Sequence, residues 1–221
     1  MKQKITHLHE KNADPENKKF LPANKDMWET YSRLNKAAVF FEGNPILVSS
    51  MTRFFITTHA LDIYLNDSKK IFQLGAFHGE MLAEYKSNGY SVMGYEYIEH
   101  AIEHMKTKGI PVRKIDLNHF TNDKLLYEKN LQEDLKDKTN IFAIRILHYL
   151  QPEALRLLML SLMNLTAKDT TIIIVDSVTT KKPANFYASF FGARTDMKID
   201  LLKTTDPTQK QVDQICVATK R

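Results

Sequence analysis

The chain has 221 residues, of which 43% are hydrophobic and 26% are charged, so it is long enough to bury one sizeable core. Its net charge is +5, but the basic residues are scattered, and no long basic run marks an arm that binds nucleic acid or a membrane. The single cysteine, Cys216, excludes an internal disulfide and a cysteine metal cluster, which fits a reducing compartment.

The N-terminal region is polar and has no apolar core of a secretory signal. No apolar stretch approaches the roughly 20 residues that cross a bilayer, so we expect a cytoplasmic protein with no membrane partner. Residues 1–25 are rich in lysine and interrupted by Pro15 and Pro22, which predicts a loose arm. Residues 26–66 carry apolar residues at helical spacing, broken near Gly43, which predicts a helical segment that covers a substrate.

From residue 67 to 221 the pattern alternates between apolar runs and amphipathic segments. The apolar runs predict strands at residues 71–74, 90–95, 112–115, 141–147 and 170–175. The amphipathic segments predict helices at 80–88, 98–108, 122–138 and 152–165. Strands and helices alternate at the spacing of βαβ units, and strands without polar alternation are buried on both faces. The sequence therefore predicts an α/β protein with a doubly wound, mostly parallel sheet.

The first predicted strand leads into the loop GAFHG, residues 75–79, and then into a helix. Ligands bind such sheets at the carboxyl ends of the strands, where small residues let a ligand approach the backbone. The loop does not fit the dinucleotide fingerprint, because Phe77 occupies its second glycine position and blocks a pyrophosphate. A strand-to-helix turn with no ligand is the alternative for the loop alone.

Two acids follow at strand ends. Glu96 ends the second predicted strand, where a carboxylate can accept hydrogen bonds from both hydroxyls of a ribose. Asp116 follows the third predicted strand, where an acid or a backbone group can meet an adenine edge. The loop and these acids favour a nucleoside ligand without a pyrophosphate, such as S-adenosylmethionine.

Four segments occur in the order and spacing of the class I S-adenosylmethionine-dependent methyltransferases: LGAFHG, GYEY, KIDLNHF and RILHYLQPEALRLL. From about Met27 to Asp176 the chain resembles the catalytic domain of small-molecule O-methyltransferases, and Ser50-Met51 is similar to a helical motif before the family's glycine loop. The resemblance implies a Rossmann-like fold, S-adenosylmethionine as cofactor and methyl transfer to a hydroxyl of a small molecule.

The resemblance also implies roles for single residues. Residues that would contact the cofactor are Gly75, Ala76, Phe77, Gly79, Glu96, Tyr97, Asp116, Leu117 and Arg145. Arg145 interrupts an apolar strand, and it either closes over the cofactor or reaches solvent. Met51 and Phe55 would line a substrate pocket, although apolar residues at this spacing also suit a core.

His148 falls on the family's general base and Asp176 on the acid that orients it. The chemistry is sound without the family, because a neutral imidazole can take the proton of an attacking hydroxyl. A carboxylate at the neighbouring strand end would fix the tautomer and stabilise the imidazolium. A structural histidine at the end of a strand is the alternative.

The chain departs from the family in several places. Gln73 replaces the acid of the glycine loop, Tyr149 replaces the aspartate after the histidine, and residues 190–221 look too short for the usual final helix and two strands. These departures support an alternative reading as a non-catalytic member that serves as a partner subunit or scaffold. The sequence leaves the oligomeric state open.

Two further site types are disfavoured. His100 and His104 lie four residues apart, but no third ligand is within reach in the sequence, so a solvated helix face is expected and no metal. The fourth predicted strand lacks the D/N-P-P-Y motif of base methylation, so no nucleic-acid partner is expected.

Overall fold

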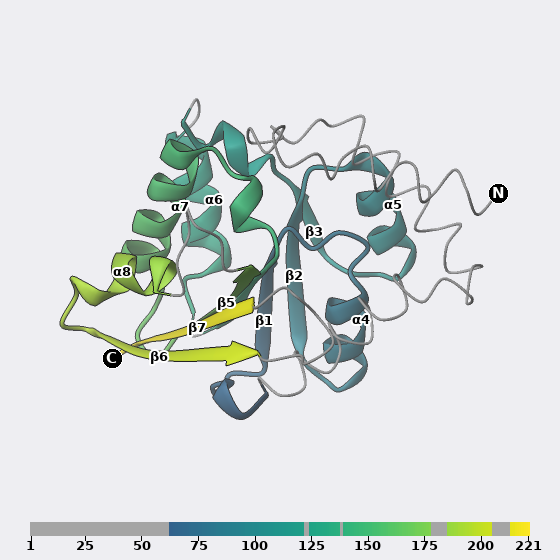
Figure 1. Cartoon of the computed structure of the whole chain (residues 1–221). Coiled ribbons are helices and arrows are strands. Elements are labelled where there is room, and N and C mark those ends of the chain that lie inside the picture. Colours follow the sequence, from purple (N-terminus) through teal and green to yellow (C-terminus); the bar gives the residue numbers. More distant parts are fainter. Residues whose placement is uncertain (1–61, 122–123, 138, 178–184, 205–212) are drawn as a thin grey trace, which may run out of the picture.

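Seven strands form one sheet in the order β3-β2-β1-β4-β5-β7-β6 (Figure 1). The computed structural model describes residues 62–121, 124–137, 139–177, 185–204 and 213–221. The strands are β1 (Lys70–Leu74), β2 (Ser91–Glu96), β3 (Val112–Lys114), β4 (Asn140–Ile144), β5 (Thr171–Ser177), β6 (Met197–Thr204) and β7 (Asp213–Lys220). Within these described residues, the α-helices are α4 (Glu80–Ser87), α5 (Glu99–Thr107), α6 (Lys124–Asp134), α7 (Pro152–Leu165) and α8 (Phe186–Gly192). The same residues form three short 3-10 turns, which are η1 (Asp62–Tyr64), η2 (Leu117–Thr121) and η3 (Leu147–Tyr149).

The strands β1 to β5 pair in parallel, and β7 pairs antiparallel with both β5 and β6. This arrangement confirms the predicted α/β fold with a doubly wound, mostly parallel sheet. The chain winds outward from β1 to β3 and then returns to β4 on the other side of β1. The point between β1 and β4 is where strand order reverses, so it is the expected place for a ligand crevice.

Helices cover both faces of the sheet, with α4 and α5 on one face and α6, α7 and α8 on the other (Figure 1). Alternate residues of β5 serve the two faces, because successive side chains of a strand point to opposite sides. Ile172 and Ile174 join the core under α7 and α8, whereas Ile173 and Val175 join the core under α4. The same alternation places Asp176 on the face of α7 and α8.

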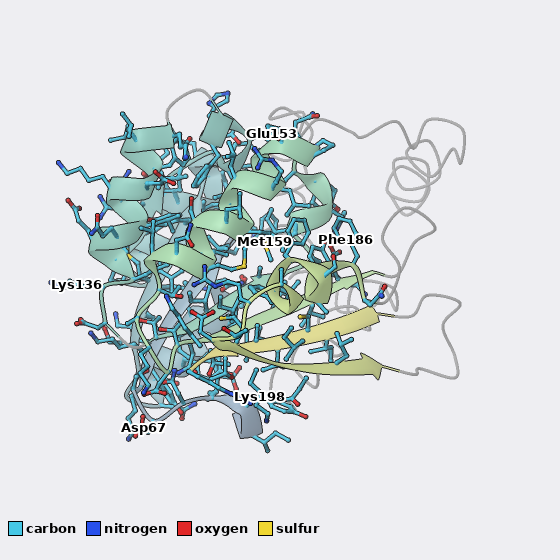
Figure 2. All side chains as sticks on the ribbon, turned by 90° about the vertical axis from the view of Figure 1, so that its left-hand side faces the viewer. Asp67, Lys136, Glu153, Met159, Phe186 and Lys198 are labelled. Carbon is cyan, nitrogen blue, oxygen red and sulfur yellow. The ribbon has the colours of Figure 1, made fainter. Side chains whose placement is uncertain are left out.

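The face under α7 and α8 holds the larger of the two clusters of buried residues. Met159 of α7 is fully buried there, and Phe186 of α8 is partly buried against the same cluster (Figure 2). The spacing of apolar residues in α7 matches its burial, because Leu155, Leu158 and Leu162 all face this core.

Residues 190–221 were expected to be too short for a final helix and two strands, and this expectation was wrong. The final helix α8 begins at Phe186, before residues 190–221, and β6 and β7 need only eight residues each. Four consecutive residues of β7, 215–218, are buried because this strand lies between β5 and β6. A buried interior strand shows no polar alternation, and that pattern identifies it only once its neighbours are known.

Two predicted strand boundaries were also wrong. The strand β4 ends at Ile144 and not at Leu147, because Arg145 adopts a left-handed backbone with φ of 50° and the chain then enters η3. Arg145 therefore follows the strand. The strand β5 extends to Ser177, because β7 continues to pair with it, and Asp176 lies opposite Gln214 within this ladder.

The N-terminal predictions cannot be followed in the structure. The loose arm at residues 1–25 and most of the helical segment at 26–66, including Met51 and Phe55, lie outside the described residues. Within the described part of the chain, none of the helices has the length and apolar character needed to span a membrane.

Candidate functional site

A pocket opens at the carboxyl ends of β1, β2, β3 and β4, at the point where strand order reverses. It is lined by Gly75, Phe77, Tyr95, Glu96, Tyr97, Ile98, Ile115, Asp116, Leu117, Asn118, Ile144, Arg145, Ile146, Tyr149 and Leu150. Most of the residues expected to contact a cofactor are among them. Ala76 and Gly79 are not, because Ala76 is buried and Gly79 packs against α5.

The glycines of the loop are required by the protein itself. Gly75 and Gly79 adopt left-handed φ values of 64° and 71°. A Cβ atom on Gly75 would lie 2.5 Å from Cγ1 of Ile146, and one on Gly79 would lie 2.6 Å from Cγ of Met105. Backbone conformation and internal packing therefore explain both glycines. The two glycines alone therefore do not distinguish a cofactor-binding loop from a strand-to-helix turn without a ligand.

Phe77 is also left-handed, with φ of 48°, a conformation that is unusual for a bulky residue. Its backbone N–H donates to Oε2 of Glu96 over 2.7 Å, which compensates for part of the strain. Its ring stacks on His78 at a centroid distance of 4.2 Å and forms part of the pocket wall. An aromatic side chain thus stands where a nucleotide-binding loop usually leaves space.

Glu96 fastens the loop to the end of β2. Its Oε1 accepts the N–H groups of Tyr97 and Ile98 at 2.8 and 3.0 Å, and its Oε2 accepts that of Phe77. Burial raises the pKa of this carboxyl above its ordinary value of 4.5, and the three N–H groups act against that rise. A carboxylate has about four acceptor positions, so bonds to described residues leave one, on Oε2. In this arrangement it can hold one ribose hydroxyl directly, and not both.

Asp116 lies two residues beyond β3 with 28% of its side chain exposed. Its Oδ1 accepts the N–H of Asn118 over 2.9 Å, and its backbone carbonyl accepts the hydroxyl of Tyr127 over 2.6 Å. Asn118 in turn accepts the N–H of Gln151 over 2.8 Å, which ties this wall to the start of α7. These hydrogen bonds hold Asp116 and Leu117 in the pocket wall, at the position where an adenine edge was expected.

Arg145 forms the wall at the end of β4, with its N–H donating to the carbonyl of Val175 over 2.8 Å. A bulky residue in left-handed conformation is held there by surrounding structure, and such residues cluster at functional sites. The pocket is therefore asymmetric in charge. Glu96 and Asp116 lie on the side of β2 and β3, and Arg145 lies on the side of β4.

His148 and Asp176 are brought into contact beside this pocket. Nδ1 of His148 lies 2.6 Å from Oδ1 of Asp176, which is completely buried, whereas 29% of the histidine side chain is exposed. His148 is not itself part of the pocket wall. Its ring contacts that of Tyr149 at a centroid distance of 3.8 Å. Tyr149 does form part of the pocket wall. The pair therefore lies next to a residue of the pocket wall.

Sequence reasoning missed Tyr187 of α8. It is fully buried, and its hydroxyl donates to Oδ2 of Asp176. No spacing rule links residue 187 to residue 176, since the contact exists only because α8 packs onto the sheet, mainly over β6 and β7. The pocket residues Ile146 and Leu150 were also missed, although they flank His148 in the segment that carried the family resemblance.

The two histidines of α5 meet a third from the loop. The ring of His78 lies 5.8 Å from that of His100 and 5.2 Å from that of His104, between ring centroids. Among the residues that the structure describes, no three His, Cys, Asp or Glu side chains are arranged to hold a metal ion.

No protein-family model and no curated protein sequence matches the chain. Solved structures do match. One is a SAM-dependent methyltransferase from Archaeoglobus fulgidus, with a TM-score of 0.54 and 18% identity over 84% of this chain and 99% of that one. Another, from Anabaena variabilis, has a TM-score of 0.54 and 16% identity over 89% and 95% of the two chains. The fold is that of the SAM-dependent methyltransferases.

The methyltransferase fold leaves the acceptor atom open. The N-methyltransferase NodS from Bradyrhizobium japonicum, solved with S-adenosylhomocysteine, is similar with a TM-score of 0.53 and 10% identity over 81% of this chain and 90% of that one. At such identities, the likeness concerns the arrangement of the strands and helices.

Proposed function

We propose that this protein is an S-adenosylmethionine-dependent methyltransferase that acts on a hydroxyl of a small molecule. His148 is the general base of this proposal and Asp176 the acid that orients it. The observation that carries it is the 2.6 Å contact between Nδ1 of His148 and Oδ1 of Asp176, beside a pocket at the reversal of strand order.

The pocket residues fit the parts of this cofactor. The acceptor position on Oε2 of Glu96 would take a ribose hydroxyl, and Asp116 with Leu117 would meet the adenine edge. The loop from Gly75 would border the methionine part, whose carboxylate would find the positive charge of Arg145 at the end of β4. Bound in this way, S-adenosylmethionine supplies an electrophilic methyl group on a sulfonium sulfur.

His148 would then act through its other ring nitrogen. When Nδ1–H donates to Asp176, Nε2 carries no proton and can accept one from the hydroxyl of the substrate. The buried carboxylate stabilises the imidazolium that results. A positioned general base contributes about 10²–10⁴-fold to a rate.

A non-catalytic protein of the same fold is the second candidate. Phe77 in the pocket wall favours it, and so do the backbone bonds that occupy most of the acceptor positions of Glu96. The apparent shortness of the tail no longer favours it, since α8, β6 and β7 complete the sheet.

Calorimetric titration with S-adenosylhomocysteine separates the two candidates. A ligand bound only by the folded state at about 100 times its dissociation constant stabilises a protein by about 2.7 kcal/mol. We expect binding and a higher melting temperature with S-adenosylhomocysteine, and neither with NAD, because Phe77 hinders a pyrophosphate. Absence of binding at millimolar ligand would favour the non-catalytic candidate.

Activity is then sought by incubating the protein and S-adenosylmethionine with a panel of phenols and other hydroxylated small molecules. Release of S-adenosylhomocysteine that depends on one of these compounds supports the proposal. Turnover only with amine acceptors would support methyl transfer but refute a hydroxyl as the acceptor group.

A further inference from the structure

Asp176 is a carboxylate in an apolar environment. It continues the row of Ile172 and Ile174 on β5 and lies under α8 with no exposed surface. Burying a charge is costly unless the group is paired and hydrogen-bonded. Two titratable groups among the described residues provide such bonds, one to each oxygen: His148 to Oδ1 and Tyr187 to Oδ2.

Tyr187 can only act as the donor of its bond. Burial, together with the negative charge of Asp176, raises the pKa of its phenol above the ordinary value of 10. The phenol therefore keeps its proton throughout the range in which a histidine titrates. Because an ionised carboxylate has no proton to give, the hydroxyl must donate to Oδ2.

The bond from Tyr187 gives the two carboxylate oxygens of Asp176 different partners. With Oδ2 held by Tyr187, the carboxylate cannot exchange its oxygens by rotation about Cβ–Cγ without breaking a bond. Oδ1 then stays directed at Nδ1 of His148, which must be the protonated nitrogen of the neutral ring.

We propose that Tyr187 is a positioning residue that holds Asp176 against His148, so that His148 keeps its proton on Nδ1 and presents Nε2 as the base. The inference rests on the proposed role of His148 and adds a residue from α8 to it. In the competing interpretation Tyr187 only fills the core between Phe191 and β5, and its hydroxyl is dispensable.

The variant Tyr187→Phe keeps the ring and removes the hydroxyl. The test is nitrogen-15 NMR of the histidine rings in the full chain, which reports the tautomer of His148 without cofactor or substrate. We expect the Nδ1-protonated tautomer to become less dominant in the neutral ring of this variant, because Oδ1 of Asp176 is no longer held against Nδ1.

Two further variants calibrate the measurement. Tyr85→Phe is the matched control, because Tyr85 is also buried and donates to a carboxylate, that of Asp62, but on the opposite face of the sheet. It should leave His148 unchanged. Asp176→Asn removes the charge that favours a proton on Nδ1 and should shift the tautomer further than Tyr187→Phe does. An unchanged tautomer of His148 in Tyr187→Phe would overturn the inference.

If Tyr187→Phe does not fold, the bond is tested with the native residue. In protein carrying carbon-13 at the tyrosine Cζ atoms and the change Tyr149→Phe, one buried tyrosine signal should shift when His148→Ala is added, since both groups share one carboxylate. Absence of any such signal would count against Tyr187. Neither measurement requires cofactor binding. A failed titration with S-adenosylhomocysteine would therefore refute the proposed function, and the role of Tyr187 could still be tested.

Discussion

Replacing Glu96 by glutamine keeps the shape of the side chain and removes its charge and one acceptor oxygen. If the amide oxygen takes the place of Oε1, it retains the N–H groups of Tyr97 and Ile98. The amide nitrogen then faces the N–H of Phe77 across the 2.7 Å that Oε2 spans in the native protein, so two donors oppose each other. The opposite rotamer leaves two N–H groups without their acceptor.

The expected loss follows from these contacts. A hydrogen bond to a charged group contributes about 1.5–3 kcal/mol. Glutamine also removes the cost of burying a charge, which is the cause of the raised pKa of Glu96, and this offsets part of the loss. We therefore expect Glu96→Gln to lower the free energy of unfolding by about 1–2 kcal/mol and the affinity for S-adenosylhomocysteine by about tenfold or more. Denaturant unfolding and calorimetry measure the two effects. Glu99→Gln is the control, since Glu99 is exposed at the start of α5 and pairs with Lys114 on the surface.

The same comparison has a predicted pH dependence. The folded-state pKa of Glu96 lies above 4.5, so its contribution to stability is complete below 4.5 and is lost as pH rises through the folded pKa. The stability of the native protein relative to Glu96→Gln should therefore be greatest at acid pH and decline toward neutrality. Ligand affinity should change in the other direction, because protonation removes an acceptor for the ribose. Native stability and native affinity in Glu96→Gln would together refute the role of Glu96 as clamp of the loop.

The remaining predictions concern the base and the loop. His148→Ala should leave affinity for S-adenosylhomocysteine nearly intact and lower turnover by about 10²–10⁴-fold, measured with the best acceptor of the panel; native turnover would exclude it as base. Phe77→Gly removes a left-handed bulky residue from the pocket wall, so calorimetry should find equal or tighter binding, and weaker binding would mean that its ring supports the ligand. Gly75→Ala should destabilise more than Gly89→Ala by about 1–3 kcal/mol in denaturant unfolding. Both glycines have positive φ, but a Cβ on Gly75 meets Ile146 and one on Gly89 meets nothing within 4 Å; equal losses would show that Ile146 yields without cost.

The local elements of the sheet could be predicted because they depend on local pattern. The strands β1 and β4 are mostly apolar, and their burial on both faces follows from helices that alternate with them. The acid that ends β2 and the loop after β1 reach the same pocket because carboxyl ends of parallel strands meet at one edge of a sheet. Alternation of strand and helix is thus enough to predict the fold class and the side on which a ligand would bind.

The contacts within the candidate site were decided by tertiary structure. Glu96 could be placed at a strand end from the sequence, but its bonds to three backbone N–H groups depend on how the loop folds back over it. The left-handed turn at Arg145 ends β4 early, and it does so inside an apolar run that gives no local signal for a turn.

The C-terminal strands and the hydrogen-bonded triad of Tyr187, Asp176 and His148 show most clearly what the sequence leaves to tertiary structure. The strand β7 is recognisable only when β5 and β6 lie on either side of it, since its pairing partners are distant in the sequence. Tyr187 reaches Asp176 because α8 packs on the face of the sheet to which Asp176 points. Periodicity in a sequence specifies which face of an element is buried, whereas the partner on that face is chosen by packing between elements that no local pattern connects.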